Sequence, residues 1–317
     1  MKAKKVKYVI FSIATLLAVF LIIEVALRLT LGNNDLGKLL YYQHDSLPCT
    51  RLKPGTEVIH SGVFKKIRPQ VHKINQYGYR GKPRGPKKSK DVFRIIIVGD
   101  SFTFCPGVPE GADYPARIEN HLHQSKGGNV EVLNFGVPSH NLLEVQAHGD
   151  ETIEFQPDLV VFQIAQNDFS PTMCALLGEQ SKFRHWLLYN SYLFRLGFGF
   201  YLISTQDYEI SNDIRMSKLE QFATDVAAFR KRHGIDAAVT SFDEPVQCEQ
   251  MTAKGCLGPI FNKYFIPYVI FPENLRSYLN LDVGHLNEEG SDLYAAFLAD
   301  WLRNQFPIND LAVDGDN

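Results

Sequence analysis

The sequence predicts an α/β domain built on a parallel β-sheet with helices on both faces, preceded by one long apolar helix. Continuous β-branched runs such as residues 93–98 are typical of strands that are buried on both faces. Helix-like stretches separate these runs, which favours a parallel sheet with crossover helices. The leading helix is predicted because residues 8–27 are apolar apart from a few hydroxyl residues and Glu24.

The apolar run is long enough for a membrane anchor, since about 20 residues cross the bilayer core as a helix. Four lysines lie among the first seven residues, and the positive-inside rule then keeps the N-terminus in the cytoplasm and everything after Leu27 outside it. A cleaved signal peptide is the main alternative, but the end of the run has no small-x-small cleavage site. A buried core helix is disfavoured by the flanking lysines. Glu24 is expected to reach the interface or to pair with Arg28, four residues on.

The next segment, residues 32–91, is basic, with lysines and arginines concentrated between residues 65 and 90. Such a stretch can contact anionic lipid headgroups or glycans. More often it is a solvated face or a linker, and this is the reading we favour. The glycines and prolines of residues 81–88 predict a linker that leads into the following domain.

The rest of the chain alternates strand-like and helix-like segments. After 93–98, strands are expected at 130–133, 158–164, 235–240 and, more weakly, 266–270. Helices are expected at 116–123, 142–155, 218–233 and 291–306. The interval 169–217 is rich in aromatic residues without a clear strand, and predicts an inserted helical layer or lid. The predicted organisation is an anchor with its basic tip (1–31), a juxtamembrane segment (32–91), one α/β domain (92–310) and a tail (311–317).

Composition excludes some classes of partner and site. The formal net charge of -2 offers no bulk attraction to nucleic acid. The five cysteines form no C-x-x-C pair, so a thiolate zinc knuckle is not predicted. Cys248 and Cys256 could close a short disulfide loop in an oxidising compartment. His121 and His123, two residues apart, do not share a helix face, so no metal site is expected there.

Chemically useful side chains follow the predicted strands at their carboxyl ends, where ligands bind in open parallel sheets. Ser101 follows the first strand, Gly136 the second and Asn167 the third. Near the C-terminus, Asp282 and His285 are separated by two residues, so the carboxylate can fold back to accept a hydrogen bond from the imidazole. Each feature alone is an ordinary turn signal. Together they supply a nucleophile, a base, an orienting carboxylate and oxyanion donors.

With these blocks in order, the sequence resembles the SGNH family, also called GDSL-type esterases and lipases. The resemblance covers residues 93–301, from the Gly-Asp-Ser block to Asp-x-x-His. It implies a flavodoxin-like three-layer α/β/α fold with a five-stranded parallel sheet. The anchor and the Asn-x-x-Gly-x-Arg stretch at residues 75–80 look like an extracytoplasmic subgroup. By resemblance the catalytic triad is Ser101, Asp282 and His285, and the oxyanion hole is built from the Ser101 N–H, the Gly136 N–H and the Asn167 side chain.

Two positions depart from the family pattern. Cys105 stands near the nucleophile where relatives usually have glycine, and Ala165 replaces the glycine that usually opens the asparagine block. Neither change removes a catalytic group, but both are expected to reshape the site or its substrate range.

The expected chemistry is acyl transfer through a covalent acyl-Ser101 intermediate, with no metal or organic cofactor required. Water resolves the intermediate in an esterase, whereas a sugar hydroxyl resolves it in an O-acyltransferase, which is the first alternative. The second is a non-catalytic envelope binding protein. A periplasmic or extracellular domain on a single-pass anchor favours acylated glycans, envelope polymers or lipid esters as substrates. The aromatic stretch 183–201 could cover an acyl chain or stack on sugar rings, but we favour its interpretation as core or as an interfacial helix.

Overall fold

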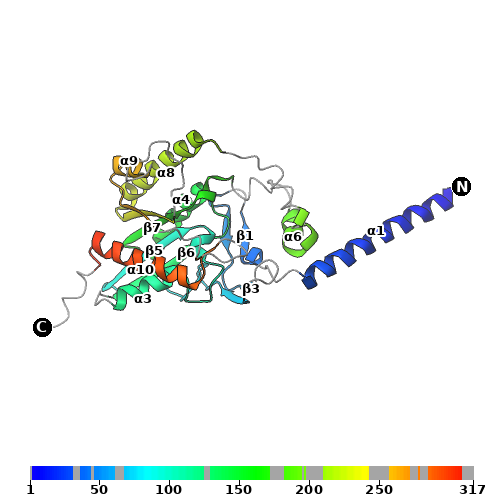
Figure 1. The fold of residues 1–317 in the computed structure, drawn as a ribbon, viewed down its shortest axis with the longest axis horizontal. Helices are drawn as coiled ribbons and strands as arrows, with labels where there is room; N and C mark the ends of the chain where they lie inside the picture. Colours follow the sequence, from blue (N-terminus) through cyan, green and yellow to red (C-terminus); the bar gives the residue numbers. More distant parts are fainter. Residues whose placement is uncertain are drawn as a thin grey trace.

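A five-stranded sheet organises the domain that follows the leading helix (Figure 1). The strand order is β6-β5-β7-β8-β9 and every neighbouring pair is parallel. Counted along the chain this is the 2-1-3-4-5 order of flavodoxin-like folds, so the predicted fold class is confirmed. The strands are β5 (Val92–Gly99), β6 (Asn129–Gly136), β7 (Leu159–Ile164), β8 (Asp236–Ser241) and β9 (Tyr268–Ile270). The computed structural model describes residues 2–30, 36–43, 46–60, 68–124, 129–171, 182–194, 196–197, 210–242, 257–271, 278 and 285–308.

Helices cover both faces of the sheet because successive strand side chains point to opposite sides. Ile95 and Ile97 of β5 belong to one hydrophobic cluster, whereas Ile96 and Val98 belong to the other. The first face packs against α3 (Tyr114–Gln124) and α10 (Glu288–Gln305), and the second against α4 (Leu142–Glu151), α8 (Asn212–His233) and α9 (Leu257–Lys263). Short 3-10 turns complete this part: η3 (Thr152–Phe155) and η4 (Gln166–Phe169).

Several element boundaries differ from the prediction, and two of the differences have a clear local cause. Helix α8 starts six residues earlier than expected, because the Ser211 side chain caps it by accepting a hydrogen bond from the Ile214 N–H (3.4 Å). Strand β9 is shorter than the expected 266–270, because Pro267 has no N–H for the ladder and sits at the start of an edge strand.

The described part of the juxtamembrane segment contains two pairs of short strands, which the reading as a solvated face or a linker did not include, whereas residues 81–88 contain no helix or strand. Strand β1 (Leu40–Tyr42) pairs with β2 (Thr50–Leu52), and β3 (Glu57–His60) pairs with β4 (Gln70–Lys73), both antiparallel. Leucines of η1 (Leu36–Leu39) and of these strands form a third hydrophobic cluster. That cluster includes Phe104, five residues after the end of β5, and Val137, the residue after β6. The segment therefore packs on the carboxyl edge of the main sheet.

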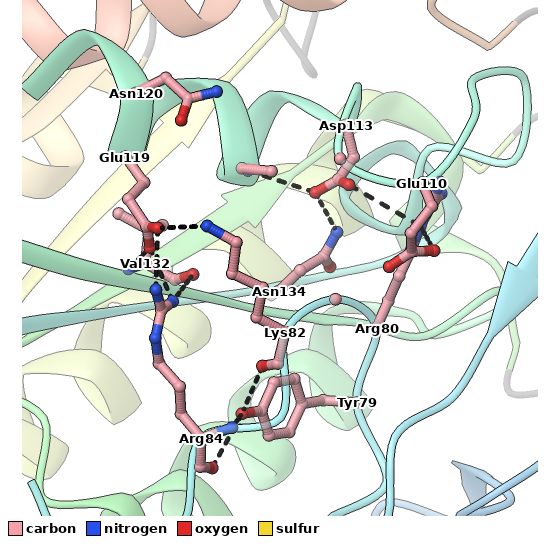
Figure 2. A pocket seen from close by; sticks show the side chains of 13 residues that line it. Tyr79, Arg80, Lys82, Arg84, Glu110, Asp113, Glu119, Asn120, Val132 and Asn134 are labelled. Atoms are coloured by element: carbon pink, nitrogen blue, oxygen red, sulfur yellow. Dashed lines mark hydrogen bonds and ion pairs between the residues drawn. The ribbon is translucent and has the colours of Figure 1, made fainter. Parts of the chain in front are cut away.

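Residues 75–88 form a strap along the outer strand β6, and a cavity of about 210 Å³ lies under it (Figure 2). The side chains around the cavity are paired with one another: Arg84 contacts Glu119 at 2.7 Å, and Lys82 contacts it at 3.4 Å. The Tyr79 hydroxyl donates to the Arg84 carbonyl at 2.8 Å. The basic strap is therefore held to the domain by matched charges.

The leading helix α1 (Lys2–Thr30) projects away from the domain (Figure 1). Its residues Val6–Thr30 are long and apolar enough to cross a membrane, a property that signal sequences share. Near its end lies α6 (Lys182–Asn190), the described helix of the predicted insertion. Most of the remaining 169–209 interval, and the tail 311–317, lie outside the described residues.

Candidate active site

Strand β5 delivers Ser101 to the carboxyl edge of the sheet, as the first residue of the short helix α2 (Ser101–Phe104). Asp100 caps this helix, its carboxylate accepting a hydrogen bond from the Phe102 N–H at 2.8 Å. Gly99 makes the close packing possible. A Cβ at this position would lie 2.2 Å from the Thr103 hydroxyl oxygen, so only glycine lets α2 fold back so tightly over the strand end.

His285 lies against Ser101 although 184 residues separate them along the chain. The distance between His285 Nε2 and Ser101 Oγ is 2.8 Å. In the tautomer protonated at Nδ1, the serine hydroxyl donates to the imidazole, as a nucleophile does to its general base. The other nitrogen, Nδ1, is buried without a hydrogen-bond partner among the described residues. Asp282, its predicted partner, lies outside those residues.

The surroundings keep the His285 imidazole neutral. Burial, together with charge repulsion from the nearby His60, lowers the pKa of His285 to about 4. A neutral imidazole is the form that accepts a proton from serine. The influence of His60 also shows that the β3–β4 hairpin lies beside the site, which the sequence did not predict.

Asn167, in η4, reaches the same edge from β7. Its side-chain Nδ2 donates to the Asp100 carboxylate at 2.8 Å. An amide carries two N–H donors. Because Asn167 is exposed, its second N–H is accessible to a bound ligand. Asp100 thus holds both the serine helix and the asparagine amide, a positioning role that sequence reasoning missed.

A second buried carboxyl lies behind this arrangement. Asp168 accepts a hydrogen bond from the Ala165 N–H at 2.8 Å. Burial and the neighbouring Asp100 raise the pKa of Asp168 well above its usual range, and burial also raises the pKa of Asp100. Two adjacent buried carboxyls disfavour double ionisation. The alanine at 165 is extended, with φ of -140°, so its backbone does not require the family's glycine.

The Gly136 N–H is not free to serve as the predicted oxyanion donor. It donates to the Asn134 side-chain oxygen at 2.9 Å and is therefore already used within the chain. A Cβ on Gly136 would lie 2.2 Å from the Phe104 backbone nitrogen. The glycine is present because α2 packs directly against the end of β6, and not as a free oxyanion donor.

Ser139 is a residue that sequence reasoning missed at this edge. It has φ of +76°, a region that residues with a side chain seldom occupy. The His140 N–H donates to the Val137 carbonyl at 3.2 Å, so Pro138 and Ser139 are the central residues of a turn. Pro at the second and a positive φ at the third position are typical of a type II turn. Such strain concentrates at functional sites; Ser139 is exposed while its neighbours are buried.

Cys105 ends α2 in the left-handed conformation, with φ of +56°. This explains why glycine is usual there. The thiol is fully buried and donates to the Phe102 carbonyl at 2.9 Å. Burial raises the pKa of Cys105 to about 12, so the thiol is unreactive at neutral pH. Cys105 therefore adopts the left-handed conformation that ends α2, and its thiol is held inside the domain.

Arg80 fixes the loop behind the serine helix. Its guanidinium is 1 % exposed and stacks 5.2 Å from the Phe104 ring. It also faces Asp113, with Nε at 3.8 Å from the carboxylate (Figure 2). Four main-chain carbonyls accept hydrogen bonds from it: those of Phe104, Cys105, Val108 and Pro109. Arg80 closes the Asn-x-x-Gly-x-Arg stretch, so that motif acts by positioning the nucleophile loop.

Comparison with protein-family models finds no match, and no curated protein matches the chain. Solved structures that align with it include a lipase/acylhydrolase from Enterococcus faecalis (14 % identity, TM-score 0.44, covering 68 % of this chain and 98 % of that one). Another is the lipase Lip_vut3 from a goat rumen metagenome (14 % identity, TM-score 0.42, covering 69 % and 99 %). The SGNH-hydrolase family esterase AlinE4 aligns at 15 % identity and TM-score 0.38, covering 69 % and 100 %. At such low identity, the roles of Ser101 and His285 rest on their own geometry.

Proposed function

We propose that this chain is an SGNH-type serine hydrolase that cleaves esters through an acyl-Ser101 intermediate. The observation that carries the proposal is the 2.8 Å contact between Ser101 Oγ and a neutral His285 at the carboxyl edge of the sheet. His285 Nδ1 has no hydrogen-bond partner among the described residues, which supports Asp282 as the carboxylate that orients the imidazole.

In the proposed reaction His285 Nε2 takes the Ser101 proton while Oγ attacks the ester carbonyl carbon. The tetrahedral oxyanion accepts hydrogen bonds from the Ser101 N–H and from the second N–H of Asn167. The Ser139 N–H, in the strained turn after β6, takes the place first assigned to Gly136. Collapse expels the alcohol with the proton from His285, and water then releases the acid by the same steps in reverse. Loss of one oxyanion donor costs about 100- to 1,000-fold in rate.

The proposed location is outside the cytoplasm, on a single-pass anchor formed by α1. Two observations support it: the apolar length of that helix and a disulfide at Cys49, since disulfides persist in oxidising compartments. The other cysteines, apart from the free Cys105, lie outside the described residues. Acylated glycans, envelope polymers and lipid esters are the substrates within reach of such a site.

The test uses the full chain in detergent micelles with a short-chain ester. Ser101→Ala and His285→Ala are expected to lower kcat by about 10⁴- to 10⁶-fold. Ser89→Ala, an exposed serine ahead of β5, serves as the control and should retain full activity. A fluorophosphonate should add to the wild type and not to Ser101→Ala, as read by intact mass.

The outcomes separate the alternatives. Equal rates for wild type and Ser101→Ala would remove Ser101 as the nucleophile. Absence of turnover and of phosphonate labelling on a broad acyl panel would favour a non-catalytic binding protein. If an added glycan acceptor becomes acylated faster than the ester is hydrolysed, the same acyl-enzyme serves an O-acyltransferase.

A further inference from the structure

Glu24 is the one carboxylate in the apolar run of α1. It lies 18 residues after Val6, which is about 27 Å along a helix axis. Since the hydrocarbon core of a bilayer is about 30 Å thick, a span that begins near Val6 places Glu24 close to the outer boundary of that core. Although the neighbouring apolar side chains are exposed, Glu24 is only 9 % exposed. An ionisable group at this depth is costly unless it has partners.

The partners of Glu24 come from the turn after α6, more than 160 residues away in sequence. The Ser191 hydroxyl donates to one carboxylate oxygen at 2.9 Å, and the Leu193 N–H donates to the same oxygen at 3.0 Å. The Tyr192 N–H donates to the other oxygen at 3.0 Å. A side chain of α1 thus accepts hydrogen bonds from two backbone N–H groups at the start of a helical turn.

Arg28 completes this contact from the next turn of α1. Its Nε lies 2.9 Å from the Glu24 carboxylate, the pairing expected from the sequence. Its guanidinium lies 5.4 Å from the centre of the Tyr192 ring, and it also donates to the Asn190 carbonyl. We refer to Glu24, Arg28 and their contacts with residues 190–193 as the clamp.

The helix held by the clamp carries exposed aromatic side chains. Phe183 and Trp186 of α6 are 66 % and 58 % exposed, and their rings stack with centroids 6.1 Å apart. At three residues apart they share one helix face. The helix also contains Lys182 and Arg184. Aromatic and basic residues on one short helix are typical of elements that lie in the membrane interface.

We propose that α1 is retained as an anchor and that the clamp holds α6 on the outer surface of the bilayer, with Phe183 and Trp186 among the lipid headgroups. Trp186 lies four residues before Asn190, about 6 Å along the helix. The polar interface on each side of the bilayer is about 5–8 Å deep. Lipid is the occupant because the helix that carries the exposed rings ends at the clamp, beside the outer end of the anchor itself. The inference rests on the orientation of α1 in the proposed function, and not on the chemistry at Ser101.

The chain contains two tryptophans, Trp186 and Trp301, so Trp301→Phe leaves Trp186 as the single fluorophore. This full-length variant is reconstituted into phosphatidylcholine vesicles with or without bromine on the acyl chains near the headgroup. Quenching of Trp186 by the brominated lipid is expected. The matched control combines Phe265→Trp with Trp186→Phe and Trp301→Phe, so that its single tryptophan stands after α9. Phe265 is 86 % exposed, and a tryptophan there should not be quenched by the brominated lipid. Equal emission of Trp186 in the two lipids overturns the proposal. It is also overturned if Trp186 is shielded by a bound protein partner and not by lipid.

A second arm tests the clamp. Glu24→Gln weakens charge-assisted hydrogen bonds, and an equilibrium between docked and free α6 should shift by about 10- to 100-fold, with loss of Trp186 quenching. Thr30→Ala is the control, because the Thr30 hydroxyl bonds only within α1 in the described structure. Intact mass of the membrane-extracted wild type should include residues 1–30; a mature chain without them overturns the proposal. Hydrolysis of a soluble ester by Glu24→Gln should match the wild type, so failure of the clamp and failure of the hydrolase are separately visible.

Discussion

Removal of the Arg80 side chain tests how the serine loop is held. Arg80→Ala deletes the four hydrogen bonds that the guanidinium donates to main-chain carbonyls of residues 104–109 and leaves the buried Asp113 without its cation. Each hydrogen bond from a charged donor is worth about 1.5–3 kcal/mol, but the guanidinium also pays a large desolvation cost. Breaking one partner of a buried ionic contact costs about 3–5 kcal/mol. We therefore expect the free energy of unfolding to fall by about 3–5 kcal/mol.

The measurement is urea unfolding of the full chain in micelles, followed by ester hydrolysis under folding conditions. Lys82→Ala is the control, because the Lys82 side chain is 75 % exposed and its ion pair with Glu119 spans 3.4 Å; it should change stability by less than about 1 kcal/mol. Since Arg80 positions the loop after Ser101, kcat should fall in Arg80→Ala even where the protein is fully folded, with a smaller effect on KM.

Arg80→Lys separates charge from geometry. A lysine keeps the positive charge but has one nitrogen, which cannot reach carbonyls spread over residues 104–109 as the planar guanidinium does. It should restore less than half of the lost stability. The reasoning is refuted if Arg80→Ala costs less than about 1 kcal/mol, or if the lysine variant equals the wild type in both stability and kcat.

Three further outcomes are expected. Gly136→Ala forces a Cβ to 2.2 Å from the Phe104 nitrogen and should lower kcat, measured by ester hydrolysis, whereas Gly197→Ala, with open space around it, should not. Ser139→Gly relieves a positive φ of 76° and should raise stability by about 1 kcal/mol in urea unfolding while activity stays, because the proposed donor is the backbone N–H; lost activity would mean that the hydroxyl acts. His285 must be unprotonated to act, so kcat/KM falls as pH drops through its pKa. The Asp282 carboxylate should raise that pKa above the value of about 4 that burial and His60 give together. Asp282→Asn should therefore move the acidic limb of the pH–rate profile to lower pH; an unchanged limb contradicts the pairing.

The sheet could be predicted because fully buried parallel strands leave continuous β-branched runs in the sequence. The whole of β5 and β7 is buried, and both strands were placed within about two residues. The proximity of Ser101 and His285 also followed, since consecutive parallel strands end at one edge and the helix α10 returns to it. The order of the strands came only from the family resemblance, because local patterns do not encode which strands are neighbours.

The juxtamembrane fold could not be predicted for a physical reason. Its strands are three or four residues long, too short for a period-2 pattern to differ from a polar linker. In the sequence, Arg80 could not be distinguished from the other basic residues as a buried group. Most of its partners are main-chain carbonyls, which every residue has. Gly136 was assigned as a donor because glycine after a strand fits both close approach and ligand contact. The structure distinguishes the two.

The folded juxtamembrane segment changes what a soluble fragment must contain. Its hydrophobic cluster includes Phe104, the last residue of the serine helix, and His60 of β3 influences the pKa of His285. A chain that begins at residue 92 exposes this cluster and removes Arg80. It should therefore lose ester hydrolysis and show broad unfolding at low temperature. A chain that begins at residue 36 should keep the ester hydrolysis and the cooperative unfolding of the full protein. If the fragment from residue 92 hydrolyses esters as fast as the full chain, the segment is dispensable and its packing on the site has no catalytic consequence.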